Sequence, residues 1–163
     1  MEKMNSLHDL FVHELKDTLD AEHQIMEAMP KMIEVTSSDI VRSKFQQHMK
    51  TTQMQIDRLH KVFSMLKMEP EREHCDGMAG IIKDGQKVIK MEGDAATKDA
   101  ALIAAAQKVE HYEISAYGTL RTFARTMGHN DIAELLQTTL EEEMKTDQTL
   151  TQVAERSINK KAA

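Results

Sequence analysis

Residues that interrupt helices are scarce in this chain, and their scarcity limits the architectures open to it. Among 163 residues there are only 6 Gly and 2 Pro. Gly and Pro are the strongest helix breakers, whereas Ala, Leu, Met, Glu, Lys and Gln, which dominate the sequence, favour helix. The sequence therefore predicts a few long helices rather than a sheet.

Four segments carry apolar residues at the spacing of three and four that one face of a buried helix needs. They are predicted at residues 6–35, 39–67, 98–127 and 131–158. Asn5 or Ser6 can cap the start of the first helix through its side-chain oxygen. Pro30 lies inside that helix, and we expect a kink or a late break there because proline removes a backbone donor.

The three connections between these helices are short, long and short. Residues 36–38 join the first pair and residues 128–130 the last pair, whereas residues 68–97 form a long crossover with a shorter helix predicted at 77–91. Short links make antiparallel neighbours, and one long crossover distinguishes the ferritin-like bundle from the simple up-and-down form. We therefore expect an all-α, ferritin-like four-helix bundle with a short fifth helix in the crossover, built from residues 1–163 as one domain.

Polar residues interrupt the apolar stripe of each long helix near its middle. These residues are Glu22; His48, Thr52 and Gln55; Glu110 and Glu113; and Thr139, Glu143 and Thr146. Glu22 and Thr52 lie equally far from the first short link, and Glu113 and Glu143 lie equally far from the last. We therefore expect the four groups to form one polar layer inside the bundle.

Four buried glutamates would be costly without compensation, because an isolated carboxylate in an apolar interior is strongly disfavoured. Three outcomes stay open: the carboxylates share protons, a cation such as Arg58 reaches in, or a divalent metal neutralises them. Carboxylates with imidazole suit iron, manganese or zinc, and bridging carboxylates can hold two ions roughly 3.5–4 Å apart. The candidate ligands are Glu22, His48, Glu110, Glu113 and Glu143.

The balance of charge and the scarcity of cysteine argue against several other classes of protein. The formal net charge is -6, which disfavours nucleic acid as a partner. The longest apolar run, residues 100–106, is too short to cross a bilayer, and the N-terminus has no apolar signal region. Cys75 is the one cysteine, which favours a reducing compartment and therefore a cytoplasmic location.

Several runs of sequence match the pattern of a known family. They are LHDLF at 7–11, DAEHQ at 20–24, MAGII at 78–82, DAALIAAAQKVEHYEI at 99–114, AYGTL at 116–120 and TLEEE at 139–143. In these runs the chain resembles the YciF/YciE family of bacterial stress proteins. The resemblance covers almost the whole chain. It implies a ferritin-like fold related to the di-iron bundles of rubrerythrin and bacterioferritin, a homodimer and a role in stress, but no defined reaction.

The resemblance also assigns roles in the polar layer. It implies iron ligands at Glu22, Glu110, Glu113 and Glu143, with either Glu110 or Glu143 bridging, and His48 matches the family pattern. Tyr117 lies one turn beyond Glu113 and could donate a hydrogen bond to a ligand or act as a radical trap; the alternative is a core tyrosine whose hydroxyl is satisfied.

The second helix departs from the family pattern. Lys50 and Thr51 stand where relatives tend to carry acidic residues, and Thr146 follows Glu143 where a ferritin-like Glu-x-x-His pair would place histidine. The loss of a carboxylate should weaken at least one metal position, although His48 could fill one vacancy.

Two functions remain open at this point. The first is a stress-response protein with a dimetal site that oxidises ferrous iron or consumes peroxide. The alternative is a non-catalytic structural or regulatory dimer with a degenerate metal site, in which glutamate introduced at Thr51 should restore metal binding. Iron storage in a large shell is a third, more remote reading.

Overall fold

Helices account for nearly all of residues 4–163, the part of the chain that this computed structural model describes. The four long ones are α1 (Leu7–Val35), α2 (Asp39–Met65), α4 (Ala95–Thr126) and α5 (Asn130–Val153). The shorter α3 (Asp76–Lys90) lies in the crossover. A π-helical turn (Ala154–Ile158) and the short α6 (Asn159–Ala162) follow α5.

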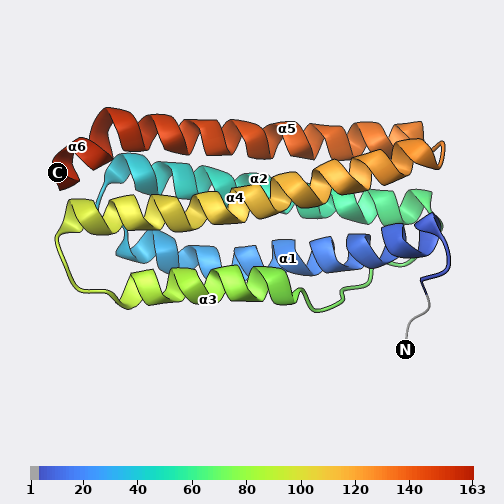
Figure 1. Cartoon of the computed structure of the whole chain (residues 1–163), viewed down its shortest axis with the longest axis horizontal. Coiled ribbons are helices and arrows are strands. Elements are labelled where there is room, and N and C mark those ends of the chain that lie inside the picture. Colours follow the sequence, from blue (N-terminus) through green and yellow to red (C-terminus); the bar gives the residue numbers. More distant parts are fainter. Residues whose placement is uncertain (1–3) are drawn as a thin grey trace.

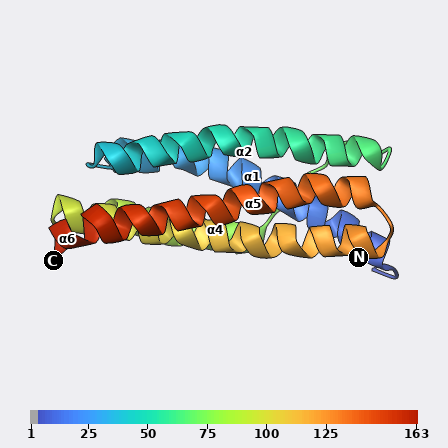
Figure 2. The same cartoon turned by 90° about the horizontal axis from the view of Figure 1, so that it is seen from above.

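The order and direction of the helices are those of a ferritin-like bundle. In Figure 1, α1 and α5 run from right to left, whereas α2 and α4 run from left to right. The crossover makes α2 and α4 parallel, and α3 lies outside the four-helix core against α1 and α4. Figure 2 shows α2 on one side of the bundle and α4 on the other, with α1 and α5 between them. The predicted fold is confirmed.

The ends of the helices follow local capping chemistry. The Ser6 side chain accepts a hydrogen bond from the backbone N–H of Asp9, as an N-cap should. Asp94 caps α4 by accepting from the Thr97 N–H at 3.0 Å, so α4 starts at Ala95, three residues before the prediction. The α2 helix ends at Met65, two residues early, because Lys67 adopts a left-handed backbone with a φ of 58°.

The long helices differ from the prediction at two points. The α1 helix continues through the exposed Pro30 to Val35, so the late break is absent, whereas the kink stays a prediction. Regular α-helix in α5 ends at Val153 rather than at Ile158, because the next turn is π-helical. Across the wider turn the Glu155 side chain is exposed and the Ile158 side chain is buried. The C-terminal end of the bundle therefore still packs against the core through Ile158.

The apolar core is divided into two clusters along the bundle. One contains Phe11, Leu15 and Leu19 of α1 with residues from the second half of α2 and the α4–α5 turn region. The other contains Ile25 and Met29 of α1 with the first half of α2, the start of α4 and Met78 of α3. The polar residues of the predicted layer lie between the clusters in every helix, so they are enclosed by apolar packing at both ends.

A buried carboxylate joins the first short link to the rest of the bundle. Asp99 of α4 is 2% exposed and accepts hydrogen bonds from the backbone N–H groups of Ser37 and Ser38 at 2.9 and 2.7 Å. These donors start α2 and have no carbonyl partner within that helix. Asp99 therefore fixes the α1–α2 turn relative to α4.

Candidate metal centre

The side chains of four predicted site residues come together in the middle of the bundle. His48 of α2, Glu110 and Glu113 of α4, and Glu143 of α5 each offer one ligand atom, and these atoms all lie within 4.8 Å of one another. All four side chains are buried, with at most 3% exposure. Such a group of carboxylate oxygens and imidazole nitrogen could hold a metal ion.

His48 lies between the two glutamates of α4. Its Nδ1 atom is 2.9 Å from Glu110 Oε1, and its Nε2 atom is 3.9 Å from Glu113 Oε2. Glu110 and Glu113 are three residues apart and therefore project from the same face of α4. The imidazole of His48 on α2 can thus approach both carboxylates of α4.

Glu22 of α1 belongs to the same layer, although it is outside the group of four. It is fully buried, and its Oε1 atom accepts a short hydrogen bond from the hydroxyl of Tyr117. Tyr117 is therefore a core tyrosine whose hydroxyl is satisfied by a candidate ligand. Tyr117 thus both occupies the core and donates a hydrogen bond to a candidate ligand.

The fifth glutamate of the region, Glu142, has a different environment. Arg58 donates to its two carboxylate oxygens at 2.9 and 3.0 Å and also to the hydroxyl of Thr139. Gln55 donates to Glu142 at 3.1 Å and, through a short contact, to Glu143. The positive charge of Arg58 is therefore directed to Glu142 and not to the candidate ligands.

No lysine or arginine in residues 4–163 forms an ion pair with Glu22, Glu110, Glu113 or Glu143. Of the three ways to compensate the layer, entry of a protein cation is thus not used. Shared protons or a bound metal remain.

Burial makes ionisation of the layer unfavourable. It raises the pKa of Glu22 to about 7, with the charge of Glu143 adding to the effect. Burial also raises the pKa of Glu110 and Glu113 well above the ordinary range, again reinforced by neighbouring carboxylates. The pKa of His48 is lowered because burial disfavours imidazolium. Without a cation, Glu22, Glu110, Glu113 and His48 are thus driven towards their neutral forms.

The hydrogen-bonding capacity of the layer is largely unused. Neither carboxylate oxygen of Glu110 or Glu113 has a hydrogen-bond partner of normal geometry within the described chain, and the second oxygens of Glu22 and Glu143 also lack one. Buried polar atoms are normally paired, and each exception calls for a partner. Several orphan oxygens and an imidazole directed to one point are the donor set that a divalent cation completes, so these residues fit a metal site.

The α2 helix contributes two buried neutral side chains beside His48. Thr52 and Gln55 are both fully buried, whereas Thr51 is half-buried and Lys50 is exposed. Thr51 lines a pocket of about 230 Å³ between α2 and α5 that reaches His48. The layer therefore lacks a carboxylate on α2, as predicted, and Lys50 does not replace a cation in it.

The histidines next to the layer in sequence stay outside it. His111 is exposed and lies 3.3 Å from Asp147, and His23 is half-buried. Asp20 was not predicted from the sequence; it is 5% exposed and accepts hydrogen bonds from Arg72, Gln24 and the N–H of Cys75. In the sequence, only the i, i+4 spacing of Asp20 and Gln24 indicates a hydrogen bond. The other two donors, Arg72 and Cys75, come from the crossover and are distant in sequence.

Comparisons with known proteins place the chain in a family. The model of the Domain of unknown function (DUF892) matches residues 6–163. Protein YciF of Escherichia coli (strain K12) is 43% identical over 160 residues, which cover 98% of this chain and 96% of that protein.

Solved structures agree with the sequence match. The crystal structure of the E. coli stress protein YciF superimposes with a TM-score of 0.92 and 42% identity over 96% of this chain and 99% of that one. YcfI of Rhodopseudomonas palustris superimposes with a TM-score of 0.91 and 39% identity over 93% and 97%. None of the helices in residues 4–163 combines the length and apolar character that spanning a bilayer requires. The chain therefore belongs to the DUF892 family and is a relative of the stress protein YciF.

Proposed function

We propose that this chain is a stress-response protein whose bundle core binds divalent metal and uses it to oxidise ferrous iron or to consume peroxide. The observation that carries the proposal is the convergence of His48, Glu110, Glu113 and Glu143 within 4.8 Å, buried and with unpaired oxygens. The similarity to the E. coli stress protein YciF supports the stress context.

The proposed ligands have distinct places in the layer. Glu110 or Glu143 would bridge two ions, and Glu22, Glu113 and His48 would each bind one. Iron is the first candidate, with manganese and zinc as alternatives for the same donors. When bound, a pair of ferrous ions would supply the two electrons that, with two protons, reduce one hydrogen peroxide to two water molecules.

The chain's own residues would hold the site ready for this chemistry. Tyr117 donates a hydrogen bond to one carboxylate oxygen of Glu22, and Gln55 donates one to a carboxylate oxygen of Glu143. These bonds orient each carboxylate and leave its second oxygen free to bind metal. Such supporting hydrogen bonds commonly orient metal ligands. The apolar clusters pack against the layer at both ends along the bundle.

Metal analysis of protein purified without an affinity tag or chelator tests the proposal. We expect iron, manganese or zinc near stoichiometry and a marked loss of metal in Glu143→Gln. Glu141→Gln on the same helix is the matched control, because Glu141 is exposed. A parent protein without metal, or equal metal content in both variants, would contradict the proposal.

The neutral side chains of α2 favour a second candidate function. Thr52 and Gln55 occupy buried positions in the layer where a carboxylate could have completed the site. YcfI, one of the solved relatives, is described as a proposed structural protein. The second candidate is therefore a structural or regulatory protein whose metal site has degenerated.

Adding a carboxylate to α2 separates the two candidates. Thr51→Glu has room in the pocket between α2 and α5, and Gln53→Glu adds the same charge at an exposed position of the same helix. Under the second candidate, Thr51→Glu alone should raise metal occupancy and peroxide consumption. Under the first, the parent is already loaded, and neither variant should gain metal.

We also propose that the protein is a cytoplasmic homodimer. The resemblance to the family supports this assembly. The α3 helix adds little free surface, because Met78 is buried and Ile81, Ile82 and Ile89 pack partly against α1 and α4. A solution mass of one chain, or of a large shell, would count against the dimer.

A further inference from the structure

Two pockets on different sides of the bundle end at the same imidazole. One, of about 150 Å³, lies between α1, α3 and α4. The other, of about 230 Å³, lies between α2 and α5. His48 lines both, so the candidate metal centre can be approached from two directions that differ in chemistry.

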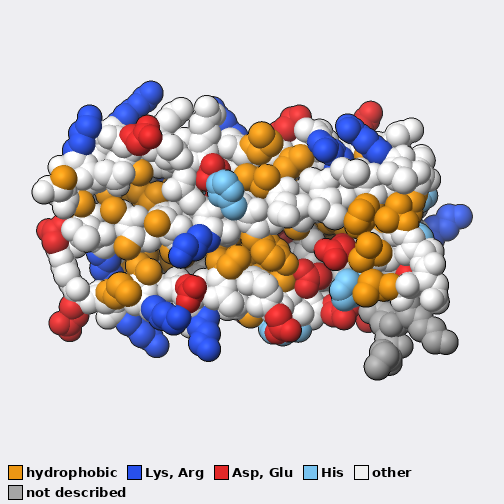
Figure 3. Space-filling view, in the orientation of Figure 1, with side chains coloured by type: hydrophobic (Ala, Val, Ile, Leu, Met, Phe, Trp, Pro, Cys, Tyr) orange, Lys and Arg blue, Asp and Glu red, His pale blue; other side chains and the backbone are white. Residues whose placement is uncertain are grey.

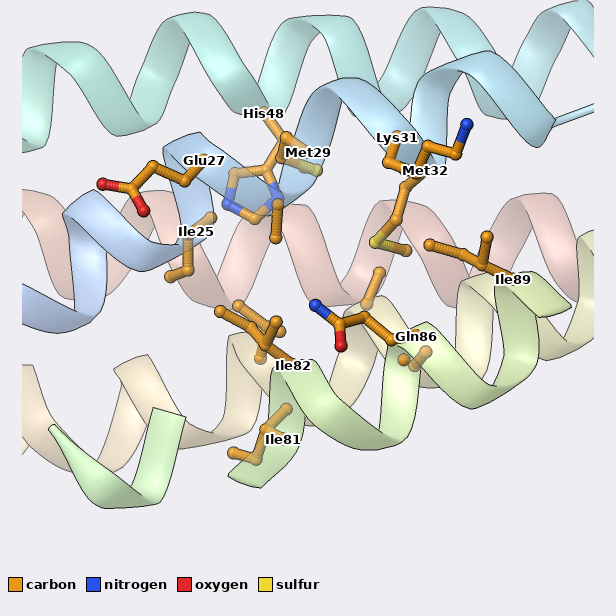
Figure 4. A pocket seen from close by; sticks show the side chains of 15 residues that line it. Ile25, Glu27, Met29, Lys31, Met32, His48, Ile81, Ile82, Gln86 and Ile89 are labelled. Carbon is orange, nitrogen blue, oxygen red and sulfur yellow. The ribbon is translucent and has the colours of Figure 1, made fainter. Parts of the chain in front are cut away.

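The pocket between α1, α3 and α4 is apolar along most of its wall. Figure 4 shows Met32 of α1 pointing towards α3, from which Ile82 and Ile89 point back, while Met29 lies beside the ring of His48 at the level of α1. The charged side chains at this pocket, Glu27 and Lys31, are exposed. A charged ligand would therefore find partners at the rim only.

Small residues keep the inner part of this pocket open. Gly85 of α3 faces Ala105 of α4, with 3.9 Å between the Ala105 Cβ and the position a Cβ at Gly85 would take. Ala106 also lines the space that leads to His48. Figure 3 shows hydrophobic side chains gathered over the strip between α3 and α4 on this face, with basic side chains along the outer edge of α3.

The second pocket has a different rim. Lys44 and Lys145 lie there with Glu142, and the threonines Thr51 and Thr146 supply hydroxyl groups. Charged or strongly hydrated species are therefore better accommodated on this side. Because the first pocket is mostly apolar and the second has charged residues at its rim, a neutral molecule fits the first pocket better.

We propose that the apolar pocket is a binding site and entry route for dioxygen, which reaches the metal centre beside His48. The pocket of about 150 Å³ has the volume of apolar cavities that hold xenon or benzene, so a diatomic gas fits. Dioxygen is favoured over larger apolar molecules because the inner end meets a candidate redox-metal site. That the pocket binds a small apolar gas stands on its lining and volume, whereas the choice of dioxygen and the role of the pocket as a route rest on the proposed function.

Binding is tested on metal-free protein with two gases. Dioxygen under pressure is paramagnetic and should broaden the methyl NMR signal of the buried Ala106 more than those of similarly buried methyls elsewhere, such as Leu136. Xenon applied to crystals should give an electron-density peak in the same pocket. No selective broadening and no xenon peak would overturn the proposal.

A plugged variant makes the test specific. Ala105→Leu fills the inner pocket, and Ala104→Leu makes the same change at the exposed neighbouring position. Only Ala105→Leu should lose the xenon peak and the selective broadening. If Ala105→Leu does not fold, Gly85→Ala narrows the same passage by one methyl group and should reduce xenon occupancy. Unchanged gas binding in the plugged variant would overturn the proposal.

Metal binding by the same variants separates this proposal from the proposed function. Manganese binding under anaerobic conditions should be equal in the parent, Ala104→Leu and Ala105→Leu. If no chain binds manganese but the gases bind the pocket, the binding site stands and the proposed function fails. If manganese binds and the gases do not enter, the gas site fails and the proposed function stands.

Discussion

At the scale of single residues, the feature that needs explanation is a group of acids in a dry interior. A buried carboxylate keeps its proton, binds a cation or destabilises the fold. Arg58 neutralises Glu142, but within the described chain nothing comparable reaches Glu110 or Glu113. The physical cost of these two side chains is therefore the main reason to infer a metal.

Glu22 makes that cost measurable in metal-free protein. Its pKa is raised from 4.5 to about 7 in the folded state, so folded protein keeps a proton that unfolded chain releases. Stability from this group is fully present below pH 4.5 and is lost as pH rises towards 7. At 1.36 kcal/mol per pKa unit, the loss is about 3 kcal/mol.

The metal-free variant Glu22→Gln lacks this loss. We therefore expect the free energy of unfolding of the variant, minus that of the parent, to increase by about 3 kcal/mol from pH 4.5 to pH 7.5. Urea denaturation at a series of pH values measures this difference. The lowered pKa of His48 acts in the opposite direction, since its contribution is lost as pH falls below 6.5, but it is common to both proteins. A pH-independent difference between them would contradict the account of Glu22.

At the scale of elements, α3 is held by the side chain of Tyr112 as well as by its apolar face. The Tyr112 hydroxyl donates to Asp17 at 2.8 Å and lies 2.9 Å from the Cys75 sulfur. Cys75 caps the start of α3, and burial raises the pKa of its thiol. The thiol is thus a packed structural group.

The first turn of α3 offers a matched pair of glycine substitutions. A Cβ at Gly77 would lie 2.8 Å from a ring carbon of Tyr112, whereas one at Gly80 meets nothing within 4 Å. Because two hydrogen-bonding partners hold Tyr112, we expect Gly77→Ala to destabilise the protein by about 1–3 kcal/mol. Gly80→Ala should stabilise it by roughly 0.5–1 kcal/mol, since alanine favours helix. Thermal unfolding of both variants checks the opposite signs; equal effects would refute the contact.

The helices were predictable because periodicity and breakers are local signals. The 3-4 stripes and the two short links were enough to bring Glu113 and Glu143 to one level. The π-helical turn after Val153 and the left-handed Lys67 were not predictable, because neither position carries the glycine or proline that would have marked it. The pairing of Asp99 with the α1–α2 turn was missed since its donors lie about sixty residues away.

At the scale of the whole molecule, a metal in the layer would join helices that otherwise meet through side-chain packing. His48, Glu110 and Glu143 come from α2, α4 and α5, so one ion would link three rods. Sequence could place these residues at one level but not their rotamers, which decide how many oxygens remain unpaired. The orphan oxygens are thus a finding of the structure alone.

Metal should therefore stabilise the whole bundle. At a free metal concentration 100 times the dissociation constant, binding adds about 2.7 kcal/mol, which raises the melting temperature by roughly 5–11 °C for a chain of this size. Calorimetry with and without manganese measures the shift. Glu113→Gln should abolish it, and an equal shift in that variant would mean that manganese binds elsewhere.

The most direct measurement is an anomalous-difference map from crystals grown with ferrous iron or manganese under anaerobic conditions. The account predicts a peak enclosed by His48, Glu110, Glu113 and Glu143, with Glu22 adjoining it. A map with no peak at this level, at a metal concentration that loads other sites on the protein, would contradict it.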